Sequence, residues 1–178
     1  MNYTPSTLNV ADIELFADNL DSTKAAEIYN AHGCLVVRGL MKPYIEAITR
    51  DIEETAQQSI ALLDEAKRIP EGWTTPNGTL FIPAPANYNR DKQIMVLGVG
   101  YFTSAAFFQS AFDTKMVDVV EAILGSNIEL FLNGQCLYKE PVGGHPKKLH
   151  QDAAYFEHKY QGPVATLNYC VDTNLQNG

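Results

Sequence analysis

The sequence lacks long apolar runs and has little cysteine. No run approaches the ~18 residues that a membrane-spanning helix needs, and residues 1–20 show neither an apolar signal core nor an arginine-rich pattern. The three cysteines, Cys34, Cys136 and Cys170, have no Cys-x-x-Cys spacing and stand in apolar or strand-like stretches. We therefore predict buried free thiols and a reducing, cytoplasmic location.

Positive charge is scarce and scattered. The net charge is −8, and the densest basic pair is Lys147–Lys148. Nucleic-acid binding depends on many cationic contacts to phosphates, and anionic membranes attract basic surfaces. We therefore expect no nucleic-acid partner and no membrane partner.

What is present is a pattern of helices followed by strands. Helices are predicted over 23–31, 43–68 and, in two pieces, 102–124; strands are predicted over 34–38, 79–82, 93–97, 127–132, 135–139, around His150, and over 164–172. The longest helix has apolar residues at every third or fourth position, which indicates packing on a core. No repeat or low-complexity linker interrupts the chain, so residues 1–178 are predicted to form a single α+β domain.

The clearest chemical signal is His150-Gln151-Asp152. Alternate side chains of a strand share a face, so an imidazole and a carboxylate two residues apart would point the same way. They are two of the three ligands in the 2-His-1-carboxylate triad that holds non-haem Fe(II). The alternative is a solvated histidine beside a surface aspartate, because this spacing is common by chance.

Three stretches resemble the phytanoyl-CoA dioxygenase family: Leu149-His-Gln-Asp-Ala-Ala-Tyr-Phe156, Gly162–Asp172 with Asn177-Gly178, and, more weakly, Gly33–Leu40. The members are Fe(II)- and 2-oxoglutarate-dependent oxygenases built on a double-stranded β-helix, or jelly roll. The resemblance implies that His150 and Asp152 are iron ligands. It also implies that Gln135 and Asn168, on the strands before and after this motif, contact 2-oxoglutarate. Lys92 lies where the family places a further cosubstrate contact, but the local match is loose.

Two family residues have no counterpart in the sequence, a distal His ligand and an Arg that pairs with the cosubstrate carboxylate. In the family they follow the Asn-Gly position at which residue 178 stands. His145, His158 and His32 are weak candidates for the third ligand. We therefore expect the N-terminal part of an oxygenase, an incomplete jelly roll buttressed by N-terminal helices, which binds iron weakly and has little activity alone.

The resemblance implies a hydroxylase of a small molecule. Related halogenases have a small residue where Asp152 stands, so the carboxylate favours hydroxylation. Two alternatives remain open. One is a non-catalytic jelly-roll binding module. The other is a site completed by association, since exposed sheet edges favour homo-oligomers.

Overall fold

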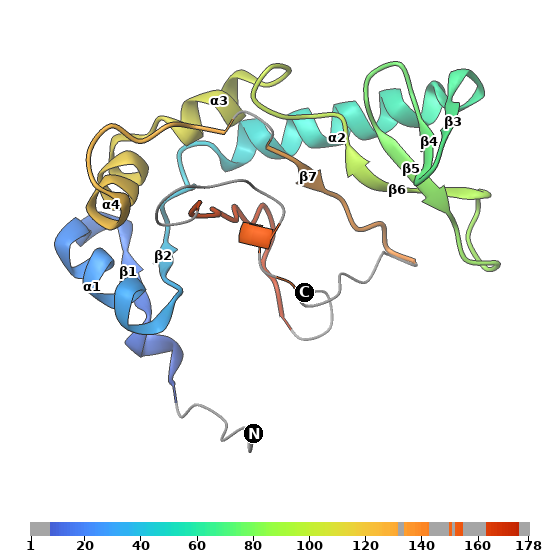
Figure 1. The fold of residues 1–178 in the computed structure, drawn as a ribbon. Coiled ribbons are helices and arrows are strands. Elements are labelled where there is room, and N and C mark those ends of the chain that lie inside the picture. Colours follow the sequence, from blue (N-terminus) through green and yellow to red (C-terminus); the bar gives the residue numbers. More distant parts are fainter. Residues whose placement is uncertain (1–7, 132–133, 143–149, 151, 155–162, 175–178) are drawn as a thin grey trace.

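The computed structural model describes residues 8–131, 134–142, 150, 152–154 and 163–174. Figure 1 shows two packed regions along this part of the chain, one around helices α1 and α4 and one around helix α2 and an antiparallel sheet. Helices and sheet occur together, so the α+β prediction is confirmed. The jelly roll and its incompleteness stay predictions, as does the single domain.

The first region is a strand–helix–strand unit with a second helix packed on it. Strand β1 (Glu14–Phe16) pairs in parallel with β2 (Val36–Arg38), and α1 (Ser22–His32) connects them. Asp21 caps α1 by accepting a hydrogen bond from the Lys24 backbone N–H at 3.1 Å, and Gly33 ends it with φ 75°. The predictions for 23–31 and 34–38 are therefore confirmed within a few residues.

Helices α3 (Ala105–Ala111) and α4 (Thr114–Leu124) form the two pieces predicted over 102–124. Ser104 and Asp113 cap them, because each side chain accepts a backbone N–H from the first turn. On α4, Val119 and Ile123 pack against Ala25 of α1, which has no exposed surface. This small cluster holds the first region together.

Helix α2 (Ile45–Ala61) carries the predicted apolar stripe, and Ile48, Ile52 and Ala56 are buried in the main core. The helix is shorter than predicted. The chain passes through a 3-10 turn, Leu63–Glu65, into a hairpin of β3 (Lys67–Ile69) and β4 (Gly72–Thr74). Pro70 has no N–H to continue a helix, and the Arg68 guanidinium lies 4.3 Å from the Trp73 ring centroid across the hairpin. After residue 61, side-chain packing across the β3–β4 hairpin therefore determines the backbone, although the spacing of apolar residues predicts a longer helix.

The sheet has five antiparallel strands in the order β3-β4-β5-β6-β7, completed by β5 (Leu80–Pro83), β6 (Lys92–Leu97) and β7 (Cys136–Leu137). Directly opposed residues on neighbouring strands share a face, so the register defines two rows. The inner row consists of Arg68, Trp73, Phe81 and Ile94; the last three belong to or pack against the main core with α2, and Arg68 at the end of the row is exposed. The outer row consists of Lys67, Thr74, Leu80, Val96 and Leu137, and it crosses an irregularity in the β5–β6 register between Leu80 and Phe81.

A buried hydroxyl network joins α2 to the sheet. The Ser59 and Thr79 hydroxyls lie 2.6 Å apart, and both residues are fully buried. The Asn77 side-chain amide donates to Ser59 at 2.8 Å, and the Gly98 backbone N–H donates to Thr79 at 2.9 Å. A Cβ atom at Gly98 would lie 2.1 Å from the Asn77 carbonyl oxygen, so this position admits no side chain.

Four predicted strands are wrong or reduced. Residues 127–131 and 163–174 belong to no ladder formed by the described residues, and Asp152–Ala154 is a 3-10 turn. The strand predicted over 135–139 is reduced to the two residues of β7. A strand needs a hydrogen-bonding neighbour, and β7 has only β6 beside it among the described strands. No helix in these described ranges is long and apolar enough to cross a membrane.

Candidate metal centre

His150 and Asp152 come together in the structure, although they do not lie on a strand. The imidazole Nε2 lies 3.2 Å from the carboxylate Oδ1, and both side chains are about half exposed, at 41% and 48%. Asp152 begins the 3-10 turn, and this turn, rather than strand alternation, brings the carboxylate to the imidazole. The conclusion that the two side chains point together holds, whereas the predicted cause was wrong.

The pair fits two neighbouring ligand positions on one divalent metal ion. With metal–ligand bonds of about 2.1 Å and a right angle between them, two donor atoms lie roughly 3.0 Å apart. The observed 3.2 Å between Nε2 and Oδ1 is close to that separation. One nitrogen donor and one oxygen donor also match the chemistry of a non-haem iron site. The two side chains could therefore bind one ion without a large rearrangement.

A third protein ligand is not found among the described residues. No group of three His, Cys, Asp or Glu side chains that could hold a metal occurs in that part of the chain. His32 is described, and it lies exposed in the last turn of α1. His145 and His158 lie outside the described residues.

The two proposed cosubstrate residues lie on the segments before and after the His150–Asp152 pair. Gln135 is exposed directly before β7, and Asn168 is half-buried in the extended stretch 163–174. Lys92 instead places its ammonium group 5.1 Å from the Trp73 ring centroid. The assignment of these residues as contacts of 2-oxoglutarate therefore stays a prediction.

The structure also shows a polar cluster that no sequence pattern predicts. The Arg90 guanidinium donates to Glu140 Oε1 at 2.6 Å and to the Tyr88 hydroxyl at 3.0 Å. The Glu140 side chain is 4% exposed, and its Oε2 has no hydrogen-bond partner among the described residues. Burial lowers the pKa of Arg90, but the hydrogen bond and charge of Glu140 outweigh it, so the pKa is raised overall. Because 50 positions separate Arg90 from Glu140, no local motif could have predicted the pair.

The cysteines are free, and they differ in burial. Cys34 is exposed, contrary to the prediction, while Cys136 and Cys170 are half-buried against the main core. Burial raises the pKa of the Cys136 thiol to about 11, and the nearby Cys170 thiol adds to the rise. Both core-facing thiols are therefore protonated at neutral pH.

An imidazole and a carboxylate that approach each other are two of the three ligand types of a non-haem iron oxygenase site, and the described residues carry them in a chain of helices and an antiparallel sheet. The family model described as phytanoyl-CoA dioxygenase (PhyH) matches residues 29–178. The chain therefore belongs to the phytanoyl-CoA dioxygenase family, whose members are Fe(II)- and 2-oxoglutarate-type oxygenases. No curated protein and no solved structure matches the chain.

Proposed function

We propose that the protein is an Fe(II)- and 2-oxoglutarate-dependent hydroxylase of a small molecule, with His150 and Asp152 as iron ligands. The observation that carries this proposal is the 3.2 Å approach of Nε2 and Oδ1, found in a chain that belongs to this oxygenase family. An imidazole nitrogen and a carboxylate oxygen are both donors that Fe(II) accepts in non-haem sites.

The remaining roles fall to residues that bind and orient. Gln135 and Asn168 would hydrogen-bond 2-oxoglutarate through their side-chain amides, each of which offers both donors and an acceptor. Iron, 2-oxoglutarate and O2 supply the oxidising chemistry when they are bound, and the protein supplies placement and exclusion of water. As a carboxylate ligand, Asp152 would occupy the iron position that a halide takes in the related halogenases. Its presence therefore supports hydroxylation.

We also infer that the described residues hold an incomplete site, because they offer no third ligand to join His150 and Asp152. Two half-exposed ligands with no third one in the described residues would hold iron weakly. The chain by itself is therefore expected to show little or no turnover.

An anaerobic Fe(II) titration of the 178-residue chain tests the iron site directly. We expect weak binding that is lost in His150→Ala and in Asp152→Asn, and retained in His32→Ala, which removes an exposed histidine elsewhere. Binding at 1:1 stoichiometry with sub-micromolar affinity would contradict the inference of an incomplete site. Binding that survives both ligand substitutions would contradict the assignment of His150 and Asp152.

A longer version of the protein tests the reaction. We expect 2-oxoglutarate-dependent succinate release that requires Fe(II), and that falls to background in His150→Ala. Succinate release that is absent despite stoichiometric iron would instead favour a non-catalytic binding module.

Association between copies is a separate part of the proposal. Strand β7 is an edge of the sheet, and its outer side pairs with no described strand. An unpaired edge is a template for pairing with another chain. We therefore expect the 178-residue chain to form oligomers through this edge, and a clean monomer in light scattering at micromolar concentration would contradict that expectation.

A further inference from the structure

We propose that the ion pair between Arg90 and Glu140 fixes the register of β7 against β6, and that it thereby positions Gln135 for its contact with 2-oxoglutarate. This inference rests on the proposed oxygenase function, because Gln135 has this role only if the cosubstrate binds. Arg90 and Glu140 are then positioning residues, which act on the cosubstrate through Gln135 and do not touch it themselves.

The ladder between β6 and β7 is too short to define a register by itself. The described residues contribute two pairs to it, Val96 with Leu137 and Leu97 with Cys136. The Tyr138 backbone N–H also donates to the Met95 carbonyl oxygen, but at 3.3 Å this hydrogen bond is long. A contact beyond the ladder must therefore select the register.

The side chains of residues 135–140 alternate between two environments. Glu140 is buried, and Cys136 and Tyr138 are half-buried against the main core. The alternate residues are exposed, namely Gln135, Leu137 and Lys139. A slip by one residue would exchange the two sets and turn Gln135 to the other face of the strand. Apolar burial opposes this slip only weakly, since both sets contain apolar side chains.

The ion pair distinguishes the observed register from its neighbours. The Arg90 guanidinium donates to Glu140 Oε1 at 2.6 Å, and it is tied to the start of β6 by a second hydrogen bond, to the Lys92 carbonyl oxygen at 3.3 Å. A slip by one residue moves β7 by about 3.4 Å and brings Lys139 or Pro141 into the place of Glu140. Lys139 would repel the guanidinium, and a proline ring offers no acceptor. Only the observed register therefore gives Arg90 an acceptor.

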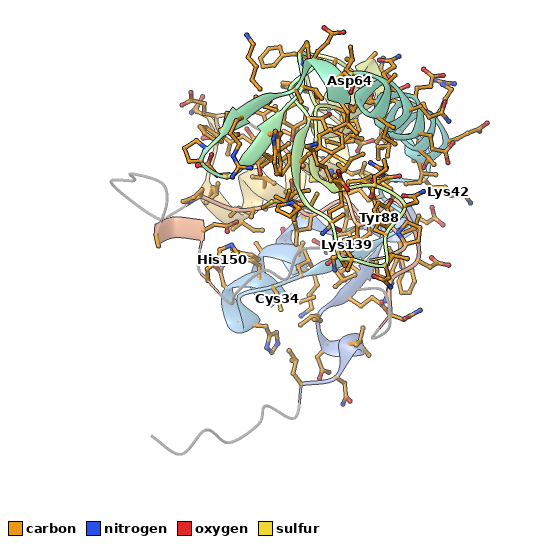
Figure 2. All side chains as sticks on the ribbon, turned by 90° about the vertical axis from the view of Figure 1, so that its right-hand side faces the viewer. Cys34, Lys42, Asp64, Tyr88, Lys139 and His150 are labelled. Carbon is orange, nitrogen blue, oxygen red and sulfur yellow. The ribbon has the colours of Figure 1, made fainter. Side chains whose placement is uncertain are left out.

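The placement of the pair favours a role in geometry over a role in stability. Figure 2 labels Tyr88 and Lys139 where the loop before β6 meets the end of the segment 135–140, and this junction encloses the pair. The Glu140 side chain is 4% exposed, and its Oε2 has no hydrogen-bond partner among the described residues. A buried oxygen without a partner lowers stability, and apolar residues often replace a buried ion pair without loss. Selection of a register is the best-attested use of such a pair.

The double variant Arg90→Met/Glu140→Leu tests this proposal on the 178-residue chain. It replaces the pair by apolar side chains of similar size, so the free energy of unfolding should stay close to that of the wild type. The register of β7 should become mixed, and a slipped strand turns Cys136 out of the core. If half of the molecules are slipped, iodoacetamide at pH 8 should modify Cys136 about 50-fold faster, because the core-facing thiol reacts about 100-fold more slowly than an unperturbed one. Cross-strand NOEs between Val96 and Leu137 should weaken in parallel.

Two further variants separate register from stability. Arg90→Met alone serves if the double variant does not fold, and Thr79→Val is its control, because it removes a buried hydroxyl from the network between α2 and the sheet and leaves the ion pair intact. Thr79→Val should keep Cys136 slow relative to Cys34. The proposal is overturned if the double variant leaves Cys136 as slow as in the wild type, or if Thr79→Val speeds its modification as much as Arg90→Met does.

Steady-state kinetics of a longer version of the protein test the link to the cosubstrate. With half of the molecules slipped, the KM for 2-oxoglutarate should double in Arg90→Met/Glu140→Leu, whereas kcat at saturating 2-oxoglutarate should stay unchanged, because binding selects the competent register. An unchanged KM together with fast modification of Cys136 would overturn the link to Gln135. Absence of succinate release from the wild type would overturn the oxygenase function, and the modification rates would still decide the role of the pair.

Discussion

Thr79→Val removes one hydroxyl from the buried network and keeps the shape of the side chain. Thr79 is fully buried, accepts the Gly98 N–H at 2.9 Å and shares a hydrogen bond with Ser59 at 2.6 Å. Ser59 keeps two other partners, the Thr55 carbonyl at 2.7 Å and the Asn77 amide at 2.8 Å. The Gly98 N–H loses the hydrogen bond that it makes to this hydroxyl.

The expected loss follows from these two changes. A buried donor left without a partner costs about 1–3 kcal/mol, and the lost hydroxyl–hydroxyl bond contributes about 1 kcal/mol. We therefore expect the free energy of unfolding to fall by about 2–4 kcal/mol. For a chain of this length that corresponds to a fall in Tm of roughly 10 °C.

Urea unfolding followed by Trp73 fluorescence and by circular dichroism measures the effect. Thr23→Val is the matched control, because Thr23 is exposed on α1, and its substitution should change stability by less than about 0.5 kcal/mol. A loss below about 1 kcal/mol for Thr79→Val, with an unchanged m-value, would refute the assignment of this network as the joint between α2 and the sheet.

Four further outcomes are expected. Arg90→Met leaves the buried Glu140 carboxylate without its cation and should lower the free energy of unfolding by about 2–4 kcal/mol. Glu140→Gln should lower it by less. Equal losses for the two variants would contradict the role of Arg90 as the cation that stabilises buried Glu140. The pKa of Cys136 in the folded protein, about 11, exceeds its ordinary value of 9.0. The stabilisation from burying the neutral thiol is therefore complete below pH 9 and is lost as the pH rises through 11. This pH dependence of the free energy of unfolding should disappear in Cys136→Ala. At pH 8 the same shift should make iodoacetamide modify Cys136 about 100-fold more slowly than an unperturbed thiol, with exposed Cys34 as the fast reference in peptide mass spectrometry. Gly98→Ala places a Cβ 2.1 Å from a backbone carbonyl oxygen and should cost about 3 kcal/mol or more, and a stable, unshifted variant in thermal unfolding would show that this approach is not tight.

The helices could be predicted because local chemistry determines them. Asp21 and Gly33 delimit α1, and the apolar stripe of α2 reports a face that does pack on the core. The end of α2 could not be predicted in the same way. The hairpin that replaces its last turns depends on Trp73 meeting Arg68 across two strands, and this contact exists only once the chain has turned back.

The strands after residue 125 were predicted less well, because a strand depends on a neighbour more than on its own residues. The stretch 164–172 has strand composition, yet no described strand pairs with it. At the candidate site the sequence identified His150 and Asp152 but predicted the wrong backbone for them, since spacing alone does not distinguish a strand from a tight turn. The cluster of Arg90 and Glu140 required the fold itself, which brings the end of β7 to the loop before β6.

The match to the family begins at residue 29, within α1, whereas the packed unit begins earlier. Expression starting at that boundary would delete β1, the parallel partner of β2, and would remove Ala25 from beneath Val119 and Ile123. A protein that begins at residue 29 would expose the apolar face of α4 and the unpaired edge of β2, and both kinds of surface promote aggregation. The first residue of the family match is therefore not a suitable first residue for expressing this protein.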